Sequence, residues 1–144
     1  MNEAVSRLLD EKTEALETVA PKTSVRRAID RMNERHIGSV LVMEGERLVG
    51  IFTERDVLTR VVPRALDPER TPVAEVMTRE LVTITPRRTV QEALMVVTDT
   101  RHRHLPVVDG QKVVGLISIG DLTRWIVRHQ QRTIDDLIDY VQRA

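Results

Sequence analysis

Residues 40–56, VLVMEGERLVGIFTERD, return 65 positions later as residues 105–121, LPVVDGQKVVGLISIGD. In both stretches, two apolar runs flank an acidic residue followed by glycine, Glu44-Gly45 and Asp109-Gly110, and this pattern predicts a β-hairpin. Both stretches then end on Gly, two apolar residues, Thr or Ser, two variable residues and Asp. A repeat of this length without a gap indicates that the chain is internally duplicated.

The duplication extends beyond the hairpins. The same shift aligns about residues 16–61 with residues 81–126, and it places Thr18-Val19-Ala20-Pro21 on Thr83-Ile84-Thr85-Pro86. This period is longer than the roughly 20–50 residues of solenoid repeats, so we expect two pseudo-symmetric halves rather than an open array.

Each half is predicted to run strand, helix, strand, strand, helix. In the second half, the β-branched run 81–84 predicts a strand, and Thr89 followed by Glu92 is a capping box that opens a helix. The apolar runs 104–108 and 112–117 predict strands, and a helix follows Ser118. In the first half, the same reasoning predicts a helix over 24–35 and another after Thr53.

Three segments lie outside the repeat. Residues 3–12 predict a short helix with Val5, Leu8 and Leu9 inward, and the proline-containing stretch 62–75 predicts a linker. Residues 126–144 predict a helix with a periodic apolar face, formed by Ile134, Leu137, Ile138 and Val141. The fold class is therefore α/β (α+β), with repeats over 1–72 and 73–144 that pack through their sheets around one core.

Composition excludes several functions. The 144 residues carry 22 basic and 22 acidic side chains, no cysteine, and three aromatic residues. Zero cysteine removes disulfides and thiolate chemistry. Neutral charge and few aromatic residues argue against a nucleic-acid or membrane-surface binder. Nineteen of the 22 basic residues are arginine, which suits bidentate contacts with carboxylate or phosphate, and only Lys12, Lys22 and Lys112 are lysine.

The repeated Gly-x-x-Thr/Ser-x-x-Asp motif has two interpretations. Thr or Ser with an acid three residues later is a helix-capping arrangement. The same place, where a buried strand ends and a helix begins, also offers free N–H groups and a positive helix end to a phosphate. A carboxylate one turn further on can accept both hydroxyls of a ribose, and glycine lets the backbone come close to a ligand.

The tandem halves, the Leu105-Pro106-Val-Val-Asp109-Gly110 hairpin and the two motifs resemble a CBS-domain pair, also called a Bateman module. The resemblance covers nearly the whole chain. It implies a non-catalytic regulatory module that binds an adenine nucleotide, AMP, ADP, ATP, NAD or S-adenosylmethionine, in two clefts between the repeats. It also implies a homodimer that signals to a regulated protein in trans.

The resemblance assigns residues to both clefts, and each cleft combines the motif of one repeat with residues of the other. The position before Pro21, often Thr in the family, is Ala20 here, so that cleft lacks one hydroxyl contact. The first cleft would be formed by Ala20, Ile37, Gly38, Arg103, His104, Ser118 and Asp121. The second cleft would be formed by Thr53, Arg55, Asp56 and Thr85, with His102 and Arg103 near the base.

Other interpretations remain open at this point. The motifs could be helix caps only, in an interaction module with vestigial nucleotide sites. An enzyme is disfavoured, because the chain has no P-loop, Gly-x-Gly-x-x-Gly or nucleophile elbow. The histidines at 102 and 104 lack an obvious third ligand, so no metal is expected. The charged first twenty residues and the lack of a long apolar run predict a soluble, cytoplasmic protein. Met32, Met43, Met77 and Met95 are predicted in the core, and Trp125 and Tyr140 either in the core or at a partner surface.

Overall fold

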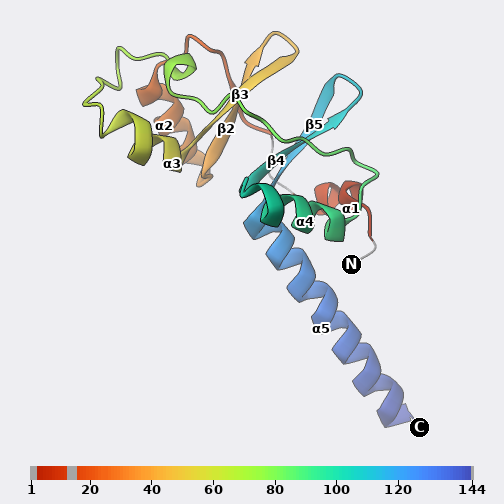
Figure 1. Ribbon diagram of the computed structural model, residues 1–144. Coiled ribbons are helices and arrows are strands. Elements are labelled where there is room, and N and C mark those ends of the chain that lie inside the picture. The colour runs from red at the N-terminus through yellow and green to blue at the C-terminus, as the bar shows by residue number, and fades with distance from the viewer. Residues whose placement is uncertain (1–2, 13–15, 144) are drawn as a thin grey trace. The chain divides into compact units, whose positions relative to one another are not determined.

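A computed structural model describes residues 3–12 and 16–143, and these residues form two compact units (Figure 1). The unit that we call the β1–β3 unit contains β1 (Thr18–Val19), α2 (Val25–Arg35), β2 (Ser39–Glu44), β3 (Arg47–Thr53), α3 (Glu54–Asp56), the π-helix η1 (Val57–Val61) and the 3-10 turn η2 (Val73–Glu75). The α5 unit contains α1 (Val5–Glu11), α4 (Val90–Thr100), β4 (His104–Asp109), most of β5 (Lys112–Ser118) and α5 (Ile119–Arg143).

The β1–β3 unit is built on a three-stranded sheet in the order β1-β2-β3. β1 runs parallel to β2, with Thr18 opposite Leu41, and β2 pairs antiparallel with β3, with Ser39 opposite Thr53. The predicted turn lies at Gly45, whose φ of 62° is in the left-handed region that glycine adopts without strain. The core of the β1–β3 unit consists of fully buried apolar side chains from the sheet, from α2 and from the 73–77 segment: Val25, Ala28, Val40, Val42, Phe52, Val73 and Val76.

β4 and β5 form the second predicted hairpin, with Gly110 at φ 63°. The strand predicted over 81–84 is wrong. Ile84 alone makes a parallel bridge to Val107, and Pro86 prevents the run from extending. The core of the α5 unit includes α1, as predicted, and its fully buried members are Val5, Val90, Ala93, Leu105, Val107, Ile117 and Leu122.

The first helix of each repeat begins and ends as the sequence repeat requires. Ser24 caps α2 by accepting a hydrogen bond from Arg27 N at 3.1 Å, and Thr89 caps α4 in the predicted reciprocal box with Glu92. Both helices stop at a residue in the left-handed conformation, His36 at φ 54° and Arg101 at φ 60°. These two stops are 65 positions apart, so the duplication includes backbone conformation as well as residue type.

Each unit is completed by the segment that precedes the other repeat in sequence. In the β1–β3 unit, Val73 N donates to Thr23 O at 2.8 Å and Val25 N donates to Thr71 O at 2.8 Å. In the α5 unit, Val5 N donates to Arg88 O at 2.7 Å and Val90 N donates to Glu3 O at 2.8 Å. The compact units therefore do not follow chain order, whereas the boundary at 72/73 stays a prediction about the sequence repeats.

Three further expectations need correction. The last part of the predicted linker is core, because Val73 is fully buried. The helix predicted over 126–144 is not a separate element, since α5 runs unbroken from Ile119 to Arg143 with neither Gly nor Pro after Gly120 to interrupt it. Met32 and Met77 are core residues as predicted, but Met95 is 56% exposed on the outer side of α4 and Met43 is half-buried.

Candidate functional site

Both copies of the Gly-x-x-Thr/Ser-x-x-Asp motif sit where a strand passes into a helix. Thr53 ends β3, its Oγ1 accepts a hydrogen bond from Asp56 N at 3.2 Å, and its own N donates to Asp56 Oδ2 at 3.0 Å. Ser118 ends β5, its Oγ accepts from Asp121 N at 3.0 Å, and its N donates to Asp121 Oδ2 at 2.9 Å. The capping interpretation is therefore realised at both motifs, and it fixes both carboxylates at helix N-termini.

Asp56 is 4% exposed, and its carboxylate faces mostly uncharged donors. Thr78 Oγ1 donates to Asp56 Oδ1 at 3.1 Å, on the side opposite Thr53. Arg60 Nε lies 3.8 Å from the same oxygen, but the Arg60 guanidinium donates its short hydrogen bonds to the carbonyls of Val76, at 3.2 Å, and Met77, at 2.7 Å. Arg60 thereby ties η1 to the 73–78 segment while adding positive charge near Asp56.

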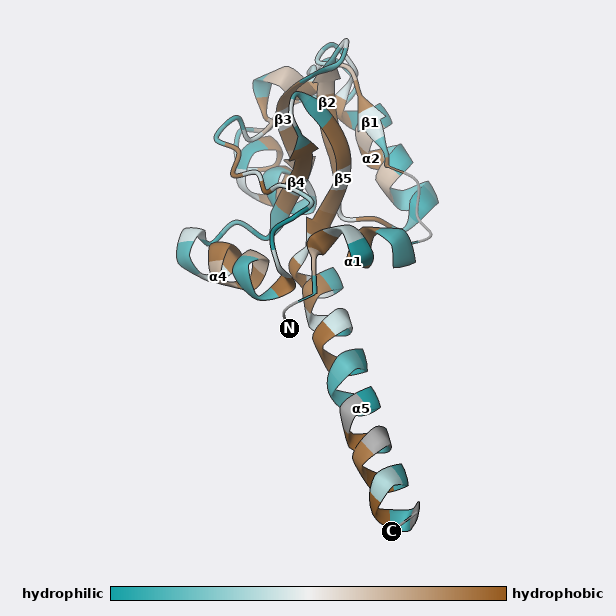
Figure 2. Ribbon diagram, turned by 90° about the vertical axis from the view of Figure 1, so that its right-hand side faces the viewer, coloured by the Kyte–Doolittle hydropathy of each residue, from teal (hydrophilic) through white to brown (hydrophobic). Residues whose placement is uncertain are grey.

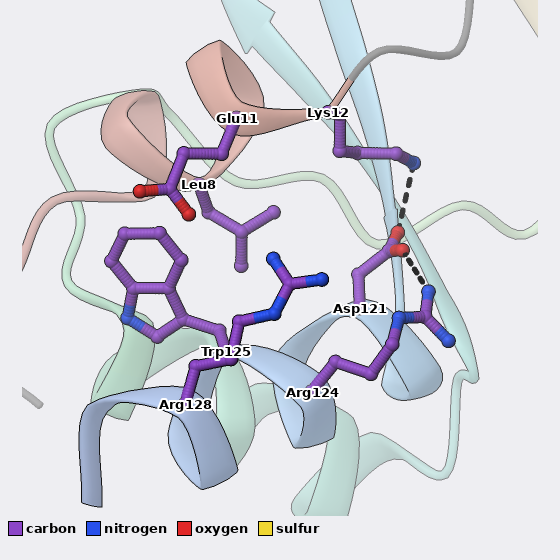
Figure 3. A pocket seen from close by; sticks show the side chains of 7 residues that line it. All are labelled: Leu8, Glu11, Lys12, Asp121, Arg124, Trp125 and Arg128. Carbon is purple, nitrogen blue, oxygen red and sulfur yellow. Dashed lines mark hydrogen bonds and ion pairs between the residues drawn. The ribbon is translucent and has the colours of Figure 1, made fainter. Parts of the chain in front are cut away.

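Asp121 is 9% exposed, and its carboxylate faces two cations. Lys12 Nζ donates to Asp121 Oδ2 at 2.8 Å, and Arg124 Nη2 donates to Oδ1 at 2.7 Å (Figure 3). Lys12 Nζ also donates to Leu116 O at 2.8 Å, so it joins the end of α1 to both β5 and α5. This buried negative charge is thus compensated by ion pairs as well as by the cap.

These contacts set the ionisation of Asp121. Burial alone raises the pKa of this carboxyl, but the hydrogen bond and charge of Lys12, together with the bonds from Ser118, outweigh burial and hold the pKa below its ordinary value. Asp121 is therefore anionic at neutral pH, which is the form that accepts hydrogen bonds from hydroxyl groups.

The motif glycines allow a close approach, but to the protein's own chain. A Cβ on Gly50 would lie 2.9 Å from Met77 Cγ and 3.1 Å from Thr78 O. A Cβ on Gly115 would lie 2.6 Å from Leu9 Cδ2. In each unit, the glycine makes room for the segment that completes that unit. This contact accounts for a glycine at the motif position without a bound ligand.

A pocket of about 150 Å³ opens beside Asp121, between α1 and the first turns of α5 (Figure 3). Leu8 and the buried indole of Trp125 form its apolar side, and the Arg128 guanidinium reaches toward them. Trp125 is 3% exposed and stacks obliquely on His129 with ring centres 4.2 Å apart, so it is a core residue, whereas Tyr140 is 75% exposed. The complete lining is Leu8, Glu11, Lys12, Asp121, Arg124, Trp125 and Arg128, which carries three cations and two carboxylates.

The other residues assigned to the first cleft divide between the units. In the α5 unit, Arg103 is exposed, its carbonyl accepts from Ile119 N at 2.9 Å beside Ser118, and the half-buried His104 begins β4. In the β1–β3 unit, Ala20 follows β1, and Ile37 and Gly38 lie between α2 and β2, where Gly38 O accepts from Glu54 N at 3.0 Å. Each unit therefore gathers its own share of this set, and the composite cleft stays a prediction.

The second set divides in the same way. Thr53 and Asp56 meet in the β1–β3 unit, and Arg55 is exposed on α3 next to them. In the α5 unit, Thr85 is exposed before Pro86, and the half-buried His102 has its Nδ1 3.0 Å from Thr100 O.

Sequence reasoning missed the residues that face the two carboxylates from outside the motif. Lys12, Thr78, Arg60 and Arg124 were not predicted to contribute. One signal was available, because Lys12 is one of three lysines in a chain whose other basic residues are all arginine. Within residues 3–12 and 16–143, no group of three or more His, Asp or Glu side chains is placed to hold a metal ion.

Comparison with known proteins assigns the family. The sequence profile of the CBS domain matches this chain twice, over residues 5–63 and 73–128. The CBS domain-containing protein YhcV of Bacillus subtilis is 33% identical over 118 residues, which are 82% of this chain and 84% of YhcV. A solved structure from Burkholderia ambifaria, described as a signal-transduction protein with CBS domains, has a TM-score of 0.84 and 37% identity, covering 89% of this chain and 96% of that one. The chain therefore belongs to the CBS-domain family and carries two CBS repeats.

Two other relatives add context. The mitochondrial CBS domain-containing protein CBSX3 of Arabidopsis thaliana is 34% identical over 120 residues, 80% of this chain, and the chain spans only 58% of that relative's length. A hexameric CBS-CP12 protein from bloom-forming cyanobacteria has a TM-score of 0.74 and 26% identity over 85% of this chain and 71% of its own. Oligomers therefore occur among the structures that this chain resembles. No helix in the described part of this chain is long and apolar enough to cross a membrane.

Proposed function

We propose that this chain is a non-catalytic regulatory module that binds an adenine nucleotide and transmits its presence to a partner protein. One observation carries the proposal: in a chain with two CBS repeats, both motifs keep a buried carboxylate one turn inside a helix, next to a Thr or Ser hydroxyl. A carboxylate so placed can accept the hydroxyls of a ribose, and the N–H groups at the helix start favour a phosphate.

The residues proposed to bind are those of the two clefts described above, with Asp56 and Asp121 on the ribose and Arg55 and Arg103 on phosphate. The ligand would be AMP, ADP, ATP, NAD or S-adenosylmethionine. Ligand binding would favour one arrangement of the halves or subunits over another, since only differential affinity shifts such an equilibrium. We further propose that the chain acts as a homodimer on a regulated protein in trans, in the cytoplasm.

Calorimetric titration with AMP, ADP, ATP, NAD and S-adenosylmethionine at fixed salt tests this proposal, with GMP as a control for the base. A thermal-unfolding measurement gives a second readout. Ligand at about 100 times its dissociation constant should add about 2.7 kcal/mol to the free energy of unfolding, which raises the melting temperature by several degrees. Asp56→Asn and Asp121→Asn should each weaken binding at one cleft. Asp99→Asn, at an exposed carboxylate on α4, is the matched control and should bind like the unmodified chain. The absence of any adenylate response would reject the proposal.

A second function is favoured by a specific observation. Both motif carboxylates already have partners within the chain, Asp121 most completely, with Lys12 and Arg124 on separate oxygens, and the position before Pro21 is Ala20. These features suit an interaction module whose nucleotide sites are vestigial. Such a module would release no nucleotide on denaturation, so mass spectrometry of the denatured, freshly purified protein distinguishes the two functions.

A further inference from the structure

From Val127 onward, α5 carries a row of exposed apolar side chains. Val127 is 58% exposed, Ile134 50%, Leu137 60%, Ile138 50% and Val141 69%. Figure 2 shows brown, apolar segments alternating with teal ones along the outer part of α5. An apolar surface of this kind costs free energy in water and marks an interaction site.

The spacing of these residues is that of a helix-pairing seam. Val127, Ile134 and Val141 recur every seven residues, and Leu137 and Ile138 fill the positions between the last two. Residues with this spacing lie on one side of an α-helix, as at the first and fourth positions of a coiled-coil heptad. From residue 127 to residue 141 the seam is about 21 Å long.

Charge along α5 is segregated between residues 124 and 141. Arg124, Arg128 and Arg132 come first along this stretch, and Asp135 and Asp139 follow. Two such helices placed in parallel bring like charges level with one another. Two placed antiparallel bring the basic half of each level with the acidic half of the other, which favours that orientation and disfavours the parallel one.

We propose that α5 pairs antiparallel with α5 of a second copy of this chain, about a two-fold axis at Ile134. In this register, Ile134 meets Ile134 of the second copy and Val127 meets Val141 of the second copy, so both ends of the seam are covered at once. The contact is isologous, which closes a dimer and leaves no free copy of the seam.

The expected strength follows from the size of the seam. A pair of helices with about four turns in contact buries less than the roughly 800 Å² per partner of a standard interface. The helix is already formed, since Leu122 and Trp125 at its start are buried in the core, so pairing does not have to pay for nucleation. We expect a reversible dimer with a dissociation constant on the order of micromolar.

Analytical ultracentrifugation over a concentration series measures this dimer. Ile134→Asp places two carboxylates against each other at the axis and should raise the dissociation constant at least a hundredfold. Tyr140→Asp adds the same charge to the same helix about 120° around its axis from Ile134, where Tyr140 is 75% exposed, and should leave the constant within threefold. Far-UV circular dichroism of both variants verifies that α5 remains helical.

Cross-linking tests the orientation, because the chain has no cysteine of its own. Under mild oxidation, Ile134→Cys should cross-link to itself. Val127→Cys mixed with Val141→Cys should give a cross-linked heterodimer, whereas each alone should stay largely uncross-linked. Leu58→Cys, an exposed apolar position in η1, is the control.

Three results would overturn the proposal. If the chain stays monomeric at every concentration, the seam binds a different protein and not a second copy. A dimer unaffected by Ile134→Asp lies on another face. Self-cross-linking of Val127→Cys alone indicates a parallel pair. This inference deepens the proposed homodimer but not the ligand site, so adenylate titration of Ile134→Asp separates the two: retained binding with lost dimerisation leaves the nucleotide function standing.

Discussion

Asp56 and Asp121 hold the same position in the two repeats, yet the groups that face them differ in charge. Around Asp56 the closest donors are the Thr53 backbone and the Thr78 hydroxyl, with Arg60 farther away. Around Asp121 the closest donors outside the cap are the cations of Lys12 and Arg124. A buried carboxylate needs donors on both oxygens, and the two units meet this need with neutral hydroxyls in one case and with ion pairs in the other.

The difference traces to the segments that complete the units. Residues 73–78 supply a hydroxyl and two backbone carbonyls to the β1–β3 unit, whereas residues 5–12 supply an ammonium group to the α5 unit. Duplicated motifs can therefore keep one geometry while their electrostatic support diverges. We expect the contribution of Asp121 to the free energy of unfolding to depend more strongly on pH than its helix cap alone would predict.

The largest effect should come from filling the space at the motif glycines. Gly50→Ala places a methyl group against Met77, which is 3% exposed, and against the Thr78 carbonyl, and it should lower the free energy of unfolding by about 2 kcal/mol. Gly115→Ala meets only the end of the half-buried Leu9 side chain, which can move, and should cost about 1 kcal/mol. Urea unfolding followed by circular dichroism compares the two variants. Equal losses would show that the two completing segments are packed alike.

The donors outside the motif should contribute next. Lys12→Met removes the cation from Asp121 and should cost about 1–2 kcal/mol, because Asp121 then keeps only Ser118 and the largely exposed Arg124. Thr78→Val removes a neutral hydrogen bond from Asp56 and should cost about 1 kcal/mol. Lys22→Met, at an exposed lysine, is the control and should change the free energy of unfolding little. A Thr78→Val loss greater than that of Lys12→Met would reverse the proposed difference between the sites.

The smallest effect is the pH dependence of the Asp121 ion pair. Because folding lowers the pKa of Asp121, its contribution to stability is fully present above the unfolded value of about 3.9 and is lost as pH falls through the lower folded value. The stability difference between the unmodified chain and Lys12→Met should therefore shrink between pH 7 and about pH 3. Denaturation curves at both pH values measure it. A difference that stays constant would mean that Lys12 acts through packing and its bond to Leu116.

Much of the fold could be predicted because its signals are local. The Thr89–Glu92 box, the helix over 24–35 and the turns at Gly45 and Gly110 each depend on residues close together in sequence, and all four are present. The strand over 81–84 failed because β-propensity is realised only when a partner strand lies alongside, and only Ile84 has one.

The candidate site was less accessible to sequence reasoning. The cap geometry of Asp56 and Asp121 follows from the motif, but Lys12 reaches Asp121 across 109 positions, and no local pattern encodes such a contact. The exposure of Met95 was missed for the same reason. An apolar residue type favours burial, but the sequence of a helix does not say which of its sides the core will cover.

Each unit is completed by a segment that precedes the other repeat, and this arrangement also sets an order of events during synthesis. Residues 16–78, which hold the sheet, the core and the completing segment of the β1–β3 unit, are contiguous in the chain, so they can assemble as soon as they leave the ribosome. Residues 3–12 are made before residues 16–78, yet the residues that bury Val5 and bind Lys12 lie between 84 and 125. Residues 3–12 thus wait for partners that are made after residues 16–78, and their apolar side chains stay unprotected until then.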